Sequence, residues 1–93
     1  MQDMAESGPI RDWHRIAVEL LMTDADLALQ SIAALFASDD KRAVARIIRN
    51  SREVYDSIQE KRKEVSLSPE EAATLDSKMD RLRARLKFLG EPL

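Results

Sequence analysis

A short segment, Ser68-Pro69-Glu70-Glu71, most constrains how this chain can fold. Ser68 can accept a hydrogen bond at the start of a helix, Pro69 suits the first helical position, and Glu71 can complete a capping box. The segment therefore predicts a helix that begins at residue 69. Its apolar residues alternate at spacings of three and four: Ala72, Leu75, Met79, Leu82, Leu86 and Leu89. Gly90 and Pro92 favour an end near residue 89.

A second periodic stretch precedes this capping segment and predicts a long helix over residues 41–65. Its stripe consists of Val44, Ile47, Ile48, Ser51, Val54, Tyr55, Ile58 and Val65. Ser38-Asp39-Asp40 supplies a turn and a cap before it. Because only a tight turn fits between residues 65 and 69, the two helices should fold back as a C-terminal antiparallel helical hairpin.

The N-terminal part predicts two further helices, over residues 9–22 and 24–37. Pro9 suits a first helical position, and Thr23 or Asp24 can cap the second helix. Nothing between Met22 and Asp26 forbids one continuous helix, so that alternative stays open. Residues 1–8 are polar and aperiodic, and we expect them to be flexible. The prediction is an all-α, three- or four-helix up-down bundle with one domain over residues 9–90.

The composition of the chain argues against several classes of function. Charged residues make up 34% of the chain, yet the net charge is only −2, which argues against a strongly basic nucleic-acid-binding protein. The absence of cysteine excludes disulfides and thiolate chemistry. No unbroken apolar run approaches the length of a membrane span, and the first residues lack the features of a signal peptide. We therefore expect a cytoplasmic protein that does not span a membrane.

No residue pattern indicates catalysis. His14 is the only histidine and lacks neighbours suited to metal binding or general-base work. The carboxylates Asp24, Asp26, Asp39 and Asp40 lie where helix starts favour negative charge, without the spacing of a calcium loop. No glycine-rich loop is present to bind phosphate. The sequence predicts no enzyme activity, no cofactor and no metal.

Arg42, Arg46 and Arg49 form a basic ridge at helical spacing on the helix expected over residues 41–65. Such a ridge can bind phosphate or nucleic acid. Alternatively, it can pair with acidic residues of the first helices or of a second chain, since residues 1–40 carry a net charge of −6 and residues 41–93 a net charge of +4. We favour pairing and keep nucleic acid as the alternative.

A chain of 93 residues buries only about 60–65% of its unfolded surface as a monomer, so a second copy would add stability. We predict a non-enzymatic protein-interaction or scaffold module that forms a homodimer or binds another helical protein. The predicted contact surface contains Trp13, Leu20, Leu29, Phe36 and Tyr55.

Residues of about 24–91 also resemble a group of small bacterial all-helical proteins. The resemblance lies in Ala45, Arg49-Asn50, Arg52 and Tyr55-Asp56, in Leu67-Ser68-Pro69-Glu70-Glu71, and in Leu82, Leu86 and Leu89-Gly90-Glu91. These are mostly core, cap and turn positions. The resemblance implies the helical fold, and it implies no activity.

Overall fold

The computed structural model describes residues 2–93, with side chains from Asp12 onward. It contains three α-helices: α1 (Gln2–Ala34), α2 (Lys41–Lys61) and α3 (Pro69–Phe88). Short 3-10 turns extend α1 over Leu35–Ala37 and α2 over Arg62–Glu64. The described residues contain no strand, so the prediction of an all-α protein is confirmed.

The predicted break between residues 22 and 24 is wrong, because α1 is continuous through it. Leu21, Ala25, Ala28 and Ile32 keep one spacing of three and four across this point, and all are buried. Interrupting the helix would expose backbone groups and require a second costly nucleation. Asp26, expected near a helix start, lies inside α1, and its carboxylate accepts a hydrogen bond of 2.6 Å from Lys78 Nζ of α3.

The prediction that residues 1–8 are flexible and that Pro9 begins the first helix also needs correction. Residues 2–8 belong to α1, so Pro9 lies inside the helix and is not its first residue; Met1 lies outside the described residues. Good helix formers such as Met4, Ala5 and Glu6 favour the helical state of this segment. Proline removes one backbone hydrogen bond inside a helix, which costs about 3 kcal/mol. The first two turns are therefore held less firmly than the rest of α1.

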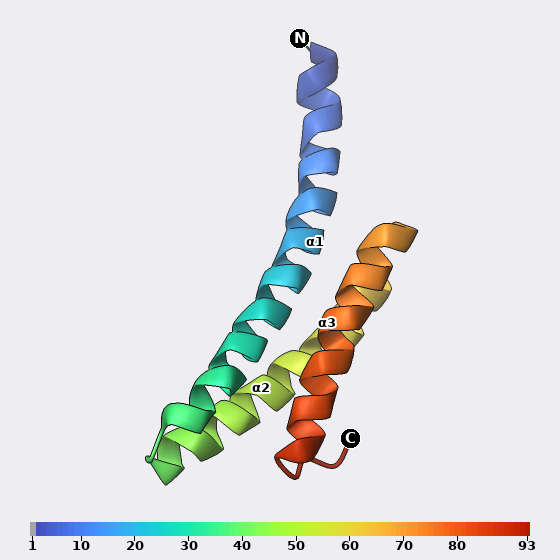
Figure 1. Cartoon of the computed structure of the whole chain (residues 1–93). Coiled ribbons are helices and arrows are strands. Elements are labelled where there is room, and N and C mark those ends of the chain that lie inside the picture. The colour runs from blue at the N-terminus through green and yellow to red at the C-terminus, as the bar shows by residue number, and fades with distance from the viewer. Residues whose placement is uncertain (1) are drawn as a thin grey trace.

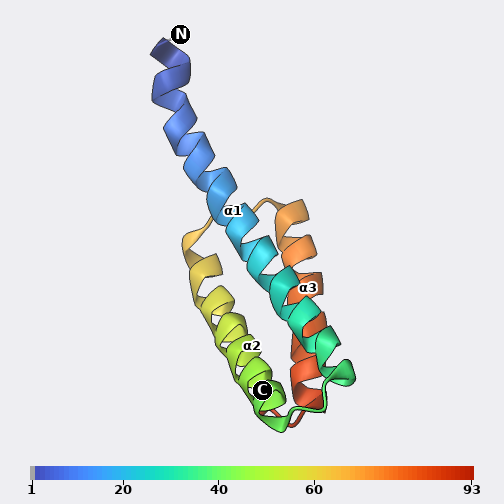
Figure 2. The same cartoon turned by 90° about the vertical axis from the view of Figure 1, so that its left-hand side faces the viewer.

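All three helices pack around one core, and α1 extends well past the other two (Figure 1). In the turned view α2 and α3 lie side by side behind the C-terminal half of α1, joined by residues 62–68 (Figure 2). The molecule measures 56 × 23 × 17 Å, so it is long and thin. The N-terminal part of α1 accounts for the extra length (Figures 1 and 2).

The core combines one face of each helix. Its buried residues are Leu21, Ala25, Ala28 and Ile32 from α1, Tyr55 and Ile58 from α2, and Leu75, Met79, Leu82 and Leu86 from α3. Fully burying each Leu, Ile or Met stabilises the fold by about 1.5–3 kcal/mol. The apolar stripe predicted for the last helix is therefore confirmed as core.

Local caps fix where the helices begin. The Asp40 side chain accepts hydrogen bonds from the backbone N–H groups of Arg42 and Ala43, and starts α2. At α3, the Glu71 N–H donates to Ser68 Oγ at 3.1 Å, and the Ser68 N–H donates to Glu71 Oε1 at 2.9 Å. The predicted capping box is confirmed. Gly90 has a φ of +97°, the left-handed conformation that favours glycine after a helix.

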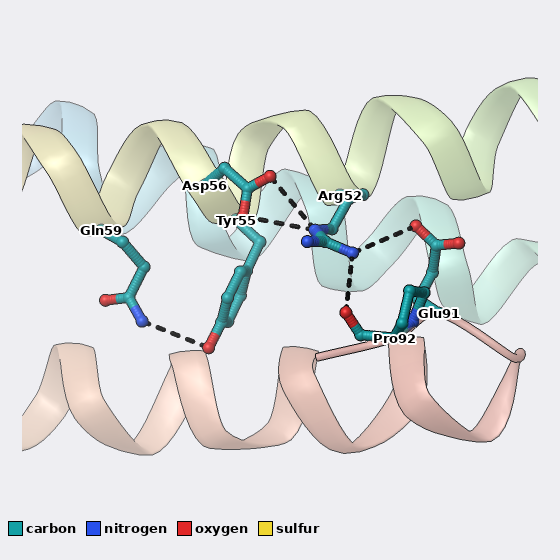
Figure 3. Close-up of polar contacts among 6 residues, drawn as sticks. All are labelled: Arg52, Tyr55, Asp56, Gln59, Glu91 and Pro92. Carbon is teal, nitrogen blue, oxygen red and sulfur yellow. Dashed lines mark hydrogen bonds and ion pairs between the residues drawn. The ribbon is translucent and has the colours of Figure 1, made fainter.

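Polar contacts also tie the chain's C-terminal end to α2. Arg52 Nη1 lies 3.7 Å from Glu91 Oε1 and donates a hydrogen bond to the Pro92 carbonyl oxygen at 3.3 Å (Figure 3). In the 3-10 turn that follows α2, Arg62 Nη1 lies 2.6 Å from Asp76 Oδ1 of α3. These contacts hold α3 and the segment after it against α2 and its last turn.

Removing the cap hydroxyl should weaken the fold. Ser68→Ala leaves the Glu71 N–H without its acceptor, and we expect the free energy of unfolding to fall by about 0.5–2 kcal/mol. Chemical denaturation followed by circular dichroism measures this. Ser66→Ala is the matched control, since Ser66 is an exposed loop residue outside the capping box. Equal losses in both variants would contradict this role of the box.

The charge of Glu71 should make stability depend on pH. The hydrogen bond from the Ser68 N–H lowers the pKa of the Glu71 carboxyl below its ordinary value of 4.5. A lowered pKa contributes stability above the unfolded value, and this contribution is lost as pH falls through the folded value. We expect wild type to be more stable than Glu71→Gln at neutral pH and to lose that advantage below pH 4.5. Unfolding curves at several pH values measure the difference, and an advantage independent of pH would contradict it.

Candidate functional site

α1 has a second apolar face, beside the face that packs in the core. Trp13, Leu20 and Leu27 lie seven residues apart and are 72%, 56% and 54% exposed. Ile16, at 44% exposure, lies between the first two. Seven-residue spacing places side chains on one side of a helix. We call these four residues the outer stripe.

The outer stripe borders α2. Leu20 lines a groove of about 370 Å³ together with Ala17 of α1 and with Lys61 and Val65. Leu27 lines a smaller groove of about 170 Å³ whose α2 wall includes Ile47, Asn50 and Val54. A partner that covers the outer stripe would therefore also meet α2.

The five residues of the predicted contact surface lie in different parts of the structure. Trp13 and Leu20 belong to the outer stripe, whereas Phe36 is exposed in the 3-10 turn that follows α1, about 35 Å from Trp13 along the helix. Leu29 is partly buried and packs against the core. The five residues therefore do not form one surface, and Leu29 is removed from the proposed contact surface.

Tyr55 is a further correction, because it lies in the core and is only 8% exposed. Its ring points from α2 toward α3, and its hydroxyl accepts a hydrogen bond of 3.2 Å from Gln59 Nε2 (Figure 3). Four residues after buried Ser51 and three before buried Ile58, it shares their helix face. Its spacing alone was enough to assign it to the core.

Phe36 lines a separate groove of about 470 Å³ between the C-terminal ends of α1 and α3. Phe88, which is exposed, forms the other aromatic wall. Arg81 and Arg85 also line this groove, and neither forms an ion pair within the part of the chain whose side chains are described. The groove is open and mostly apolar, with two cationic groups at its edge.

The predicted basic ridge is present on α2, where Arg42, Arg46 and Arg49 are all exposed. Among residues 12–93, none of the three lies within 4.0 Å of a carboxylate oxygen. Pairing of this ridge with acidic residues of the first helices is therefore wrong for a single chain. α1 and α3 are joined by Lys78 with Asp26, and by His14 Nε2 at 3.8 Å from Glu71 Oε1.

An acidic half continues the same exposed face of α2 and was missed in the sequence. Glu53, Asp56 and Glu60 are exposed and follow the arginines at helical spacing. The arginines lie nine, five and two residues before Ser51, and the carboxylates lie two, five and nine residues after it. This mirror symmetry was visible in the sequence. We call the six residues the charged face.

The charged face is unfavourable for an isolated helix. Like charges three and four residues apart repel each other, as Arg42 and Arg46 do and as Asp56 and Glu60 do. The positive charges also lie near the positive end of the helix dipole, and the first turn of α2 has no acidic residue. The arrangement therefore does not serve the stability of α2 itself.

The described side chains offer little for catalysis. Among residues 12–93 no three His, Asp or Glu side chains lie close enough together to hold a metal ion. His14, at the exposed junction of α1 and α3, has only Glu71 beside it. The geometry brings together surfaces for contact, and no acid–base or nucleophilic arrangement stands out in this part of the chain.

Part of α1 has the length and hydropathy of a membrane span. The segment Asp12–Ala37 has 26 residues and a mean hydropathy of 1.4 in its most apolar window, of which 28% is buried. Core helices of soluble proteins can have the same length and mean hydropathy. In this fold Ala25, Ala28 and Ile32 of the segment are covered by the other helices.

Comparisons with protein-family models, with curated proteins and with solved structures found no match to this chain.

The assignment of Tyr55 to the core can be tested against an exposed aromatic. Tyr55→Ala should lower the free energy of unfolding by about 3–5 kcal/mol, because it removes a buried ring. Phe88→Ala, which changes a largely exposed ring, should alter it by less than about 0.5 kcal/mol. Urea unfolding of both variants measures the two values. A small loss for Tyr55→Ala would return Tyr55 to the surface candidates.

Proposed function

We propose that this protein is a non-enzymatic, self-associating interaction or scaffold module that pairs through the outer stripe of α1. The observation that supports this is the exposure of four large apolar side chains at helical spacing on one face: Trp13, Ile16, Leu20 and Leu27. Contiguous apolar patches on small proteins mark contact surfaces. Trp is also among the residues that contribute most to binding energy.

The geometry of α1 supports a helical partner of similar length. Specific interfaces bury about 800 Å² on each side, which four side chains alone do not supply. The grooves beside Leu20 and Leu27 extend the surface onto α2. The part of α1 that projects beyond α2 and α3 adds further helix surface for a partner (Figure 1).

In this proposal the molecule acts as an up-down bundle in which α2 and α3 form the antiparallel hairpin. The hairpin covers one face of α1 and leaves the outer stripe beside it exposed, where a second molecule can pack. Because the membrane-length segment contains the core residues of α1, we propose pairing in solution, in the cytoplasm, in preference to membrane insertion.

A second candidate is phosphate or nucleic-acid binding through Arg42, Arg46 and Arg49. Their lack of ion pairs within the described residues supports it. The carboxylates Glu53 and Glu60 on the same face oppose it, because they repel a phosphate backbone. Such binding would weaken steeply with salt. Self-association remains the function that these surfaces support best.

Charged substitutions on the outer stripe should abolish self-association. We expect Leu20→Glu/Leu27→Glu to shift the protein to monomer, because each dimer would bury four uncompensated carboxylates. Light scattering after size exclusion, with circular dichroism to verify folding, measures this. Ala73→Glu/Thr74→Glu, on the exposed side of α3, is the matched control and should leave the mass unchanged. A wild type that stays monomeric at high concentration would contradict the proposed function.

A further inference from the structure

We propose that the partner is a second copy of this chain, and that its α2 packs antiparallel on α2 through the charged face. This inference rests on the proposed self-association and specifies its orientation. The charged face consists of Arg42, Arg46, Arg49, Glu53, Asp56 and Glu60, all exposed on one side of α2.

The mirror symmetry of the charged face predicts the register. Consider two antiparallel copies of α2 whose two-fold axis passes at the level of Ser51. A residue that precedes Ser51 by a given number of positions then lies level with the residue of the other copy that follows Ser51 by the same number. Arg42 then lies level with Glu60, Arg46 with Asp56, and Arg49 with Glu53. The two-fold axis repeats every pair, as a symmetric dimer requires. Arginine and carboxylate side chains are long enough to meet at the level position or at its nearest neighbour.

The alternative orientation is excluded by the same charges. A parallel, in-register pair would place arginines against arginines and carboxylates against carboxylates. Like charges across an interface are strongly unfavourable and act against wrong partners. The charged face therefore favours the antiparallel orientation of a second copy over the parallel one. A uniformly charged ligand would attract one half of the face and be repelled by the other.

Most of the charged face is available for such pairing. Arg42, Arg46, Arg49 and Glu53 form no ion pair within the described part of the chain. Asp56 contacts Arg52 at 3.1 Å, and Glu60 contacts Lys63 at 3.4 Å. Both of these pairs lie within one helix or its last turn and have exposed carboxylates, so a second copy can compete for them.

The charged face and the outer stripe have different roles in this dimer. Exposed ion pairs contribute mainly to specificity and orientation, whereas buried apolar surface supplies most of the affinity. Leu27 shares a groove with Asn50 and Val54, so the outer stripe borders the helix that bears the charged face. A second copy can therefore contact both surfaces at once.

Charge reversal tests the orientation directly. An acidic variant, Arg42→Glu/Arg46→Glu/Arg49→Glu, has only carboxylates on this face. A basic variant, Glu53→Lys/Asp56→Lys/Glu60→Lys, has only cations. Each variant alone should dimerise at least tenfold more weakly than wild type at low salt. An equimolar mixture should form a heterodimer, detected by native mass spectrometry and quantified by sedimentation, and raising the salt concentration should weaken it.

Folding of both variants is favoured, because acidic residues early in α2 and basic residues late in it agree with the helix dipole. Circular dichroism verifies this. The control is Arg81→Glu/Arg83→Glu/Arg85→Glu, which makes the same change in charge on α3 and should leave dimerisation unchanged.

The outcomes separate the two proposals. If wild type dimerises, and outer-stripe variants are monomeric while both reversal variants still dimerise, the antiparallel arrangement is wrong and the proposed function stands. Reversal variants that weaken dimerisation but fail to pair with each other also overturn it. If the acidic variant loses binding to duplex DNA but dimerises normally, the arginines bind phosphate instead. A wild type that is monomeric throughout contradicts both proposals.

Discussion

The packing of a single face of α1 against two shorter helices is the contact on which the rest of this structure depends. Leu21, Ala25, Ala28 and Ile32 are buried there, and they hold α2 and α3 around one core. Two small alanines lie between the large side chains of Leu21 and Ile32, which lets the helices approach closely. Both shorter helices use this one face, and the outer stripe beside it stays exposed.

That asymmetry explains why the outer stripe is more than scattered apolar exposure. Single exposed leucines are normal on protein surfaces. Here the exposed residues repeat at seven-residue spacing on the same helix whose neighbouring face forms the core. α1 is also longer than α2 and α3, so they can cover only part of it. A helix with two apolar faces is suited to connect one packed unit to another.

Local signals predicted the fold where neighbouring residues determine it. The capping box at Ser68 and Glu71 and the apolar stripe from Leu75 to Leu86 depend on residues close in sequence, and both appear as expected. The continuity of α1 through Thr23 could not be predicted in this way, because the charge of Asp26 suits either a helix start or an ion pair with α3. The choice depends on Lys78, which is distant in sequence and becomes a neighbour only after folding.

The candidate surfaces were predicted less well, because apolar periodicity in a sequence does not show which face of a helix the other helices cover. Leu20 and Leu29 both lie on apolar stripes of α1, but only Leu20 remains exposed. The ridge at Arg42 was identified without its acidic counterpart, since arginines suggest phosphate when considered alone. Together with Glu60 and its neighbours, the same arginines indicate a self-complementary surface. Apolar burial has no preferred direction, whereas this pattern of charge does. A dimer that uses both would gain affinity from one helix and orientation from the other.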